Sequence, residues 1–341
     1  MQNEITKPSN LLDENGELIQ KGWARKPLMK YNRENIKAGW SRIKEWDNYN
    51  ILCPNYGISM TIADVGYLAL SGVHWLDFKE HNYTADDQMN FFSKGSLNMP
   101  RTSEEGDISY SNEKAKMSFK RLKDRRIITL DFPQFMNGKG IKGELTLFQD
   151  PNADSMVIAT PWKKKPTQFY YNQKVNCMPT KGTIQLGTDY YEFDENTCFA
   201  VLDWGRGVWK YKNEWYWGNA SGRLADGTKI GWNIGYGFGD TSAATENMIF
   251  YDGKAHKFDS LTFDFNPKDY MKPWKFVSND GRFNVTCEPT LDRSTKTNFI
   301  ILKSQLRQIF GRYSGKVVLD DGTEVKVDNI MGFAEWVKNR W

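Results

Sequence analysis

The sequence has little histidine and lacks the common phosphate-binding and nucleophile motifs. Its 341 residues include three histidines, and none of them stands in H-E-x-x-H spacing. There is no G-x-x-x-x-G-K-S/T loop and no G-x-S-x-G elbow, and GYGFGDTS lacks the spacing of a dinucleotide fingerprint. A structural metal site needs a complete ligand set, which the sequence does not offer. We therefore expect neither a metal nor a cofactor.

Long apolar runs and long runs of like charge are missing as well. No window approaches the roughly 18 apolar residues of a membrane span, and the first residues show no secretory signal. The net charge of +4 comes from 46 basic and 42 acidic residues that are mixed along the chain, without a basic tail for nucleic acid. The sequence predicts a cytoplasmic protein with no membrane span and no nucleic-acid partner. It indicates no oligomeric state.

The four cysteines, Cys53, Cys177, Cys198 and Cys287, lie far apart and form no CxxC pair. Disulfides persist mainly in exported proteins, and no export signal is visible. The sequence therefore predicts reduced, buried thiols.

Aromatic residues and period-two alternation are abundant. The chain contains 13 Trp, 16 Tyr and 20 Phe, and its apolar residues repeatedly alternate with small or polar ones. Such alternation predicts strands with one buried face. The clearest runs are Ile58-Met60-Ile62, Ile128-Leu130-Phe132, Leu261-Phe263-Phe265 and Phe283-Val285-Cys287. Helical periodicity is clear only in RENIKAGWSRIKEW, where we expect one short amphipathic helix.

Four Asp-Gly pairs in the second half of the chain predict hairpin turns between these strands. They are Asp226-Gly227, Asp252-Gly253, Asp280-Gly281 and Asp321-Gly322. The pattern favours an all-β fold of antiparallel barrels or sandwiches over any βαβ architecture. A Pro- and Lys-rich segment, ATPWKKKPTQFYYNQKVNCMPTKG, interrupts the pattern. We place a domain boundary within it, which gives an N-terminal β domain at 1–170 and a C-terminal β domain at 171–341.

The segment IGWNIGYGFG carries a glycine stripe. Bulky residues from Ile230 to Phe238 occupy one strand face, and the other face holds glycines, including Gly235 and Gly237, together with Asn233. Glycine weakens a strand, so a whole face of it indicates that a ring or a ligand approaches the backbone closely. We expect Gly235 and Gly237 to face an interior space, with packing by a ring as the simpler alternative to a ligand.

Charged and aromatic residues flank this stripe. Trp215 and Trp217 share one strand face. In DWGRGVW, Asp203 and Arg206 lie among Trp204, Trp209 and glycines, so we predict that the two charges form a partly buried pair near the mouth of a pocket.

Two further polar residues, Glu246 and Asn247, precede an apolar strand. Together with Asp203 and Arg206 they are interpreted either as a satisfied structural network or as a polar cluster at an aromatic pocket.

Several motifs resemble one bacterial family. DWGRGVW, WYWG, GDTSAATEN, YMKPW, QIFGRYSG and GFAEW are similar, in order and type, to the family catalogued as domain of unknown function 2804. That family is more distantly similar to two-barrel lipocalin-like proteins, among them carotenoid hydratases and tocopherol cyclases. The resemblance implies two lipocalin-like barrels or half-barrels packed side by side, with few short helices. It implies no reaction.

The leading functional hypothesis is the binding of an apolar or amphipathic small molecule, lipid-like or isoprenoid-like by resemblance, in an aromatic-lined β pocket. The residues expected to form it are Trp204, Arg206, Trp209, Trp217, Asn233, Gly235, Gly237 and Asn247. A hydratase or cyclase is the first alternative, with Asp203 or Glu246 as the acid and indole rings to stabilise a cation. A carbohydrate-binding or carbohydrate-acting β protein is the second, since aromatic platforms with Asp, Asn and Arg also suit sugars.

Overall fold

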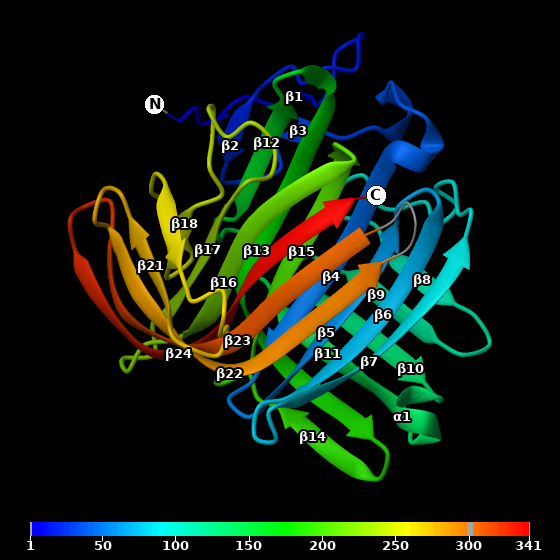
Figure 1. The fold of residues 1–341 in the computed structure, drawn as a ribbon, viewed down its shortest axis with the longest axis vertical. Coiled ribbons are helices and arrows are strands. Elements are labelled where there is room, and N and C mark those ends of the chain that lie inside the picture. Colours follow the sequence, from blue (N-terminus) through cyan, green and yellow to red (C-terminus); the bar gives the residue numbers. More distant parts are fainter. Residues whose placement is uncertain (1, 299–302, 341) are drawn as a thin grey trace.

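The structure is a computed structural model that describes residues 2–298 and 303–340. Nearly all of its regular structure is antiparallel strand, arranged in two large curled sheets (Figure 1). A small parallel pair, β1 (Ser9–Asn10) and β3 (Met29–Lys30), lies apart from them. The helical elements of the described residues are the 3-10 turns η1 (Arg33–Asn35) and η2 (Trp40–Arg42) and the single turn α1 (Phe135–Gly138).

The first sheet contains thirteen strands. Their bounds are β2 (Gly22–Ala24), β4 (Ile43–Leu52), β5 (Tyr56–Asp64), β6 (Leu68–Asp77), β7 (Asn82–Phe91), β8 (Ile108–Ser111), β9 (Lys116–Arg121), β10 (Arg125–Phe132), β11 (Ile141–Phe148), β12 (Met156–Trp162), β13 (Lys165–Leu186), β14 (Asp189–Phe193) and β15 (Phe199–Val208). The main path runs β7-β6-β5-β4-β15-β13-β11-β10-β9-β8, and β13 also pairs with β12 and β14.

The second sheet contains nine strands. Their bounds are β16 (Lys212–Arg223), β17 (Lys229–Tyr236), β18 (Met248–Tyr251), β19 (Lys254–Lys257), β20 (Leu261–Asp264), β21 (Trp274–Ser278), β22 (Phe283–Asn298), β23 (Lys303–Val318) and β24 (Glu324–Arg340). The order is β19-β18-β17-β16-β24-β23-β22-β21-β20. Each of the four Asp-Gly pairs lies between two paired strands, as predicted, and each of their glycines has positive φ.

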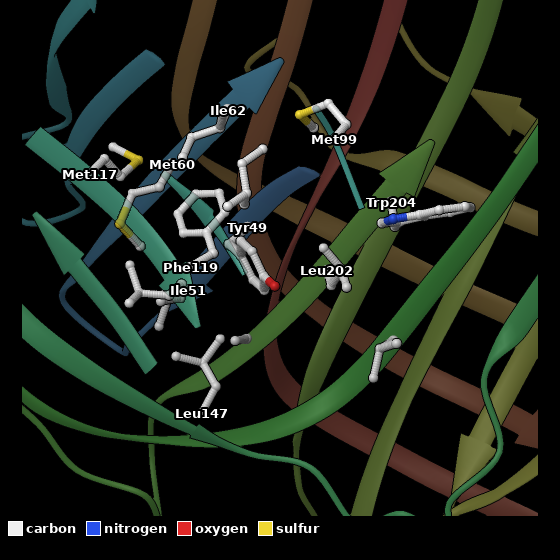
Figure 2. Close-up of a cluster of buried hydrophobic side chains, with 14 of the residues drawn as sticks. Tyr49, Ile51, Met60, Ile62, Met99, Met117, Phe119, Leu147, Leu202 and Trp204 are labelled. Atoms are coloured by element: carbon white, nitrogen blue, oxygen red, sulfur yellow. The ribbon is translucent and has the colours of Figure 1, made fainter. Parts of the chain in front are cut away.

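Each sheet curls around its own apolar core, so each is a half-barrel. In the first, Ile51 of β4 and Met60 of β5 face Met117 and Phe119 of β9 across the curl (Figure 2). The predicted alternating runs supply these inward faces: Ile58, Met60 and Ile62 are all fully buried. In the second, Trp232, Trp274, Phe283 and Tyr313 fill the curl. The interiors of both half-barrels are thus occupied by their own side chains.

The two half-barrels pack through their outer faces. The long strands β22 to β24, orange to red in Figure 1, run from the second sheet towards the first. Along them Leu291, Phe310 and Phe333 share an apolar cluster with Leu52 and Val201 of the first sheet. A buried layer therefore lies between the two sheets. It is formed by the outward side chains of β13 and β15 and by the side chains of the second sheet that face them.

Two expectations about local structure are wrong. The segment expected as an amphipathic helix forms η1, η2 and then β4. From Ile43 onwards the chain pairs with β5 and β15, and alternate residues such as Tyr49 and Ile51 enter the first core. The expectation of four reduced thiols also fails, since Cys53 and Cys198 form a disulfide. Strands β4 and β15 pair at Leu52 and Phe199, which brings the neighbouring cysteines together. Cys177 and Cys287 remain free.

The change of sheet does not coincide with the boundary predicted near residue 170. That residue lies inside β13, and β13 and β15 both belong to the first sheet. The second sheet begins at β16, so the sheets divide at residues 209–211. Within the described parts of the chain, no helix has the length and apolarity required to cross a membrane.

A buried polar layer between the two sheets as the candidate site

Strand alternation sorts the candidate residues into two compartments. On β13, Phe169 and Tyr171 point into the first half-barrel, so Tyr170, Asn172 and Lys174 point outward to the second sheet. On β15, Asp203 likewise points outward. We call the buried polar and indole side chains that meet there the inter-sheet layer. Its members are Tyr170, Asn172, Lys174, Asp203, Trp215, Trp217, Asn233, Glu246, Gln308 and Glu335.

An ion pair lies at the centre of the inter-sheet layer. Lys174 Nζ is 2.8 Å from Asp203 Oδ1, and Asn172 Nδ2 donates to the same oxygen at 2.6 Å. The ammonium also lies 3.9 Å from the ring centroid of Trp217, at cation–π distance. Asp203 was one of the two acids considered for catalysis. Because it accepts from an ammonium, it acts here as a counter-ion.

The second sheet holds its polar residues in register opposite this ion pair. Trp217 pairs with Glu335 across β16 and β24, and Gln308 pairs with Glu335 across β23 and β24, so all three side chains share one face. Trp217 Nε1 donates to Asn233 Oδ1 at 2.7 Å, and Asn233 Nδ2 donates to the backbone oxygen of Glu246 at 2.9 Å. Asn233 is thereby held in place from both ends of its amide.

Two carboxyl groups in the inter-sheet layer have raised pKa values. Glu335 accepts from Trp215 Nε1 at 3.1 Å and from Gln308 Nε2 at 3.0 Å. Burial nevertheless raises the pKa of Glu335 to about 7, because removal from water penalises the charged carboxylate more than these donors favour it. Burial also raises the pKa of Glu246, against the lowering effect of the Lys174 charge. Near neutral pH a substantial fraction of the Glu335 side chains is thus protonated and can donate a proton.

Two buried polar atoms of the layer have no hydrogen-bond partner among the described residues. Asn172 Oδ1 and Gln308 Oε1 are both of this kind, and both side chains are almost completely buried. Leaving a buried polar atom unsatisfied costs roughly 1–3 kcal/mol, so such atoms are rare in folded proteins. A bound molecule or ordered water in the layer would supply the missing partners.

The predicted pair of Asp203 and Arg206 does not exist, and the prediction is wrong. The two residues are three apart on β15, so their side chains leave opposite faces of the strand. Arg206 points into the first half-barrel, where its head group bonds to Asp47 at 3.0 Å and to three backbone carbonyls. Trp204 lies on the same inward face, beneath the Arg206 guanidinium at 4.1 Å. These two predicted ligand-binding residues belong to the first core.

Trp209 and Gly237 lie at one end of the inter-sheet layer. Trp209 packs edge-on against Trp46 and Phe238, with centroids 5.1 and 5.2 Å away. Phe238 was expected on the same face as Ile234, but Gly237 has φ +96° and breaks the alternation, which turns Phe238 into the aromatic cluster between the sheets. A Cβ on Gly237 would meet Glu214 O at 2.6 Å. Backbone geometry therefore explains this glycine.

Gly235 and Asn247 border the layer. The Gly235 nitrogen donates to Asn247 Oδ1 at 2.9 Å, and Asn247 Nδ2 donates to Asp259 O at 2.5 Å, so Asn247 ties β17 to the loop between β19 and β20. A Cβ on Gly235 would lie 2.8 Å from Tyr216 O and 3.5 Å from Glu246 Oε2. Gly235 thus faces the candidate acid Glu246.

The sequence matches a known protein family. The family model described as Domain of unknown function (DUF2804) matches residues 2–341. The chain belongs to this family. The resemblance inferred from the sequence motifs is thereby confirmed. No curated protein matches the sequence of this DUF2804 member.

Solved structures are similar to the DUF2804 chain in fold. The crystal structure of CghA with Sch210972 aligns with a TM-score of 0.50 at 9% sequence identity. The alignment covers 87% of this chain and 88% of the CghA chain. Kievitone hydratase from Nectria haematococca aligns with a TM-score of 0.47 at 12% sequence identity. The alignment covers 100% of this chain and 97% of the kievitone hydratase chain. The predicted all-β fold of two lipocalin-like half-barrels side by side is confirmed.

Sequence reasoning missed half of the layer in this DUF2804 member. Tyr170, Asn172 and Lys174 lie in the segment that was interpreted as a boundary, although they alternate with Phe169 and Tyr171 as strand residues do. That alternation was the available signal. Glu335 lies in the motif GFAEW, and Gln308 is the first residue of the motif QIFGRYSG. The two side chains lie on the same face of the sheet because β23 pairs with β24. The sequence pattern within either strand does not predict that pairing.

Proposed function

We propose that the protein binds an amphipathic small molecule in the inter-sheet layer. The polar group of the ligand meets Lys174, Asp203 and Glu335, and its apolar part lies against the indoles of Trp215 and Trp217. One observation carries the proposal: the layer combines a buried ion pair with the unpartnered atoms Asn172 Oδ1 and Gln308 Oε1. Ligand sites commonly join apolar walls to a few converging polar groups, and this layer has that composition.

The filled half-barrels support the same location. Trp232 and Tyr313 pack edge-on inside the second half-barrel, with centroids 5.4 Å apart, and the first half-barrel contains the packed cluster of Figure 2. A carbohydrate site is less well supported, because Trp204, Trp209 and Trp217 are 1%, 3% and 6% exposed, whereas sugars stack on open ring faces.

Native mass spectrometry of protein purified from its own host tests the proposal. We expect a non-covalent adduct that disappears on denaturation and partitions into organic solvent. A sugar mass would favour the carbohydrate alternative. A protein that carries no adduct, and acquires none from an organic extract of that host, would contradict small-molecule binding.

Acid catalysis is a second candidate, favoured by the raised pKa values of Glu246 and Glu335 beside an indole face. In such a reaction a neutral carboxyl would protonate an alkene carbon, and water would add to the resulting cation and return a proton to the carboxylate. The structure favours Glu246 and Glu335 over Asp203 for this role, since Asp203 is paired with Lys174.

Deuterium incorporation distinguishes catalysis from binding alone. The co-purified molecule is incubated with the protein in D₂O and analysed for carbon-bound deuterium. Catalysis predicts incorporation by the wild type, and loss of incorporation with retained binding in Glu246→Gln or Glu335→Gln. If the wild type incorporates none, the protein is a binder only.

A further inference from the structure

A separate cavity lies beside the part of β13 that follows Lys174. It has a volume of about 220 Å³ and is enclosed by segments from both sheets and by the loop before β12. Phe148 and Phe250 contribute apolar wall, and Asn176, Cys177 and Lys229 contribute polar wall. Such a volume suits one small molecule. None of these five residues belongs to the layer described above.

A bulge in β13 presents two of these residues. The pairing of β13 with β15 shifts between Val175 and Met178, so Asn176 and Cys177 have no partner on β15. Cys177 has φ +56°, a left-handed conformation that a residue with a side chain rarely adopts, and its nitrogen donates to Ser221 Oγ at 3.1 Å. Bulges and strained residues concentrate beside functional sites, where they redirect side chains.

Most charged groups on the cavity wall already have protein partners. The pairs are Glu104 with Arg121, Asp154 with Arg25 and the Ala255 nitrogen, Asp150 with the Asn152 nitrogen, and Lys26 with the carbonyls of Pro151 and Ala153. Lys229 differs, because its ammonium has no hydrogen bond or ion pair within residues 2–298 and 303–340.

Asn176 also retains an unused atom. Its Nδ2 donates to Trp232 O at 3.0 Å, but its Oδ1 is buried and has no partner in the described chain. The wall therefore offers a free cation, a free acceptor and two phenyl rings.

We propose that this cavity binds a small carboxylic acid that also carries an O–H or N–H donor. The carboxylate pairs with Lys229, the donor bonds to Asn176 Oδ1, and the hydrocarbon part contacts Phe148 and Phe250. Cys177 forms part of the wall and takes no chemical role, because burial raises the pKa of its thiol to about 11. This site is independent of the function proposed for the inter-sheet layer.

Cys177 provides the test. Iodoacetate and iodoacetamide alkylate thiols in the same way and differ mainly in charge. Their rates at Cys177 are measured at pH 9 by peptide mass spectrometry and divided by their rates with glutathione. We expect iodoacetate to be favoured on the order of fivefold, because Lys229 attracts the carboxylate. Lys229→Met should abolish the preference. Lys254→Met, at an exposed lysine on β19, should preserve it, and the core residue Cys287 should stay unlabelled.

Two results would overturn the anion site. One is a ratio of iodoacetate to iodoacetamide rates at Cys177 that equals the ratio for glutathione and does not change in Lys229→Met. The other is a Cys177 that neither reagent labels in the folded protein although both label it after unfolding. The donor is tested by protection of Cys177 from iodoacetamide: 4-hydroxyphenylacetate should protect at lower concentration than phenylacetate, and Asn176→Leu should remove the difference. Equal protection of the wild type by the two acids would refute the role of Asn176.

Discussion

The Arg206 network and the Lys174–Asp203 network are both buried and ionic, and they differ in how completely their polar groups are satisfied. In the first half-barrel, the Arg206 head group directs all its donors to Asp47, Trp46 O, Gly205 O and Pro100 O. In the inter-sheet layer, Lys174 and Asp203 pair beside amides whose oxygens lack partners. A saturated network stabilises a fold and leaves nothing to offer a ligand. An unsaturated one in an equally buried place is the better candidate for binding.

The largest expected effect comes from breaking the saturated network. Arg206→Met should lower the free energy of unfolding by about 3–5 kcal/mol, because it leaves the buried Asp47 carboxylate without its charged partner. Equilibrium denaturation measures the change. Arg101→Met removes an exposed pair with Glu34 in the same half-barrel and should cost less than about 1 kcal/mol. Equal losses in the two variants would contradict a structural role for the Arg206 network.

The next effect depends on pH and comes from the unsaturated network. Burial raises the pKa of Glu335 from 4.5 to about 7, so the folded state binds the proton more tightly than the unfolded state. The stability that this carboxyl contributes is present below pH 4.5 and is lost as pH rises to 7, by about 3 kcal/mol. Glu335→Gln removes this dependence, and its amide can donate to Gln308 Oε1 after a flip of the Gln308 amide.

Denaturation of both proteins at pH 5 and pH 8 checks this prediction. Glu335→Gln should gain stability relative to wild type at pH 8, and the gain should shrink at pH 5. Glu324→Gln, at an exposed pair with Lys316, serves as the control and should show little change at either pH. A Glu335→Gln difference that is the same at both pH values would show that Glu335 is ionised throughout.

A smaller effect is expected from filling the layer. Gly235→Val should destabilise the protein by about 1–3 kcal/mol, because its Cβ would lie 2.8 Å from Tyr216 O and its methyl groups would crowd Glu246. Thermal denaturation measures the loss. A variant as stable as wild type that binds its ligand equally well would mean that Gly235 borders open space.

The fold could be predicted from the sequence because its signals are local. Alternation in the run from Ile58 to Ile62 and the Asp-Gly turns each act over a few residues, and the structure confirms both. The site depends on contacts between distant strands. Asn233 and Trp217 were found because both stand out within one stretch of chain, whereas Lys174 meets Trp217 only after the two sheets pack.

The errors have the same origin. Asp203 and Arg206 are close in sequence, but strand geometry separates them to opposite faces. Cys53 and Cys198 are 145 residues apart and become neighbours only through the pairing of β4 with β15. Closeness in sequence therefore suggested an ion pair between Asp203 and Arg206 that does not form. Distance in sequence hid the disulfide between Cys53 and Cys198.

A matched pair of glycine variants tests the central claim, that the ligand lies between the sheets and outside the half-barrels. Gly235 faces the layer, whereas Gly218 on the adjoining strand faces the second core, where its Cβ would meet Ile234 at 2.9 Å. Native mass spectrometry is applied to wild type, Gly235→Val and Gly218→Val, each purified from the original host. The account predicts that the small-molecule adduct persists in Gly218→Val and disappears in Gly235→Val. An adduct retained by folded Gly235→Val, or lost only from Gly218→Val, would contradict it.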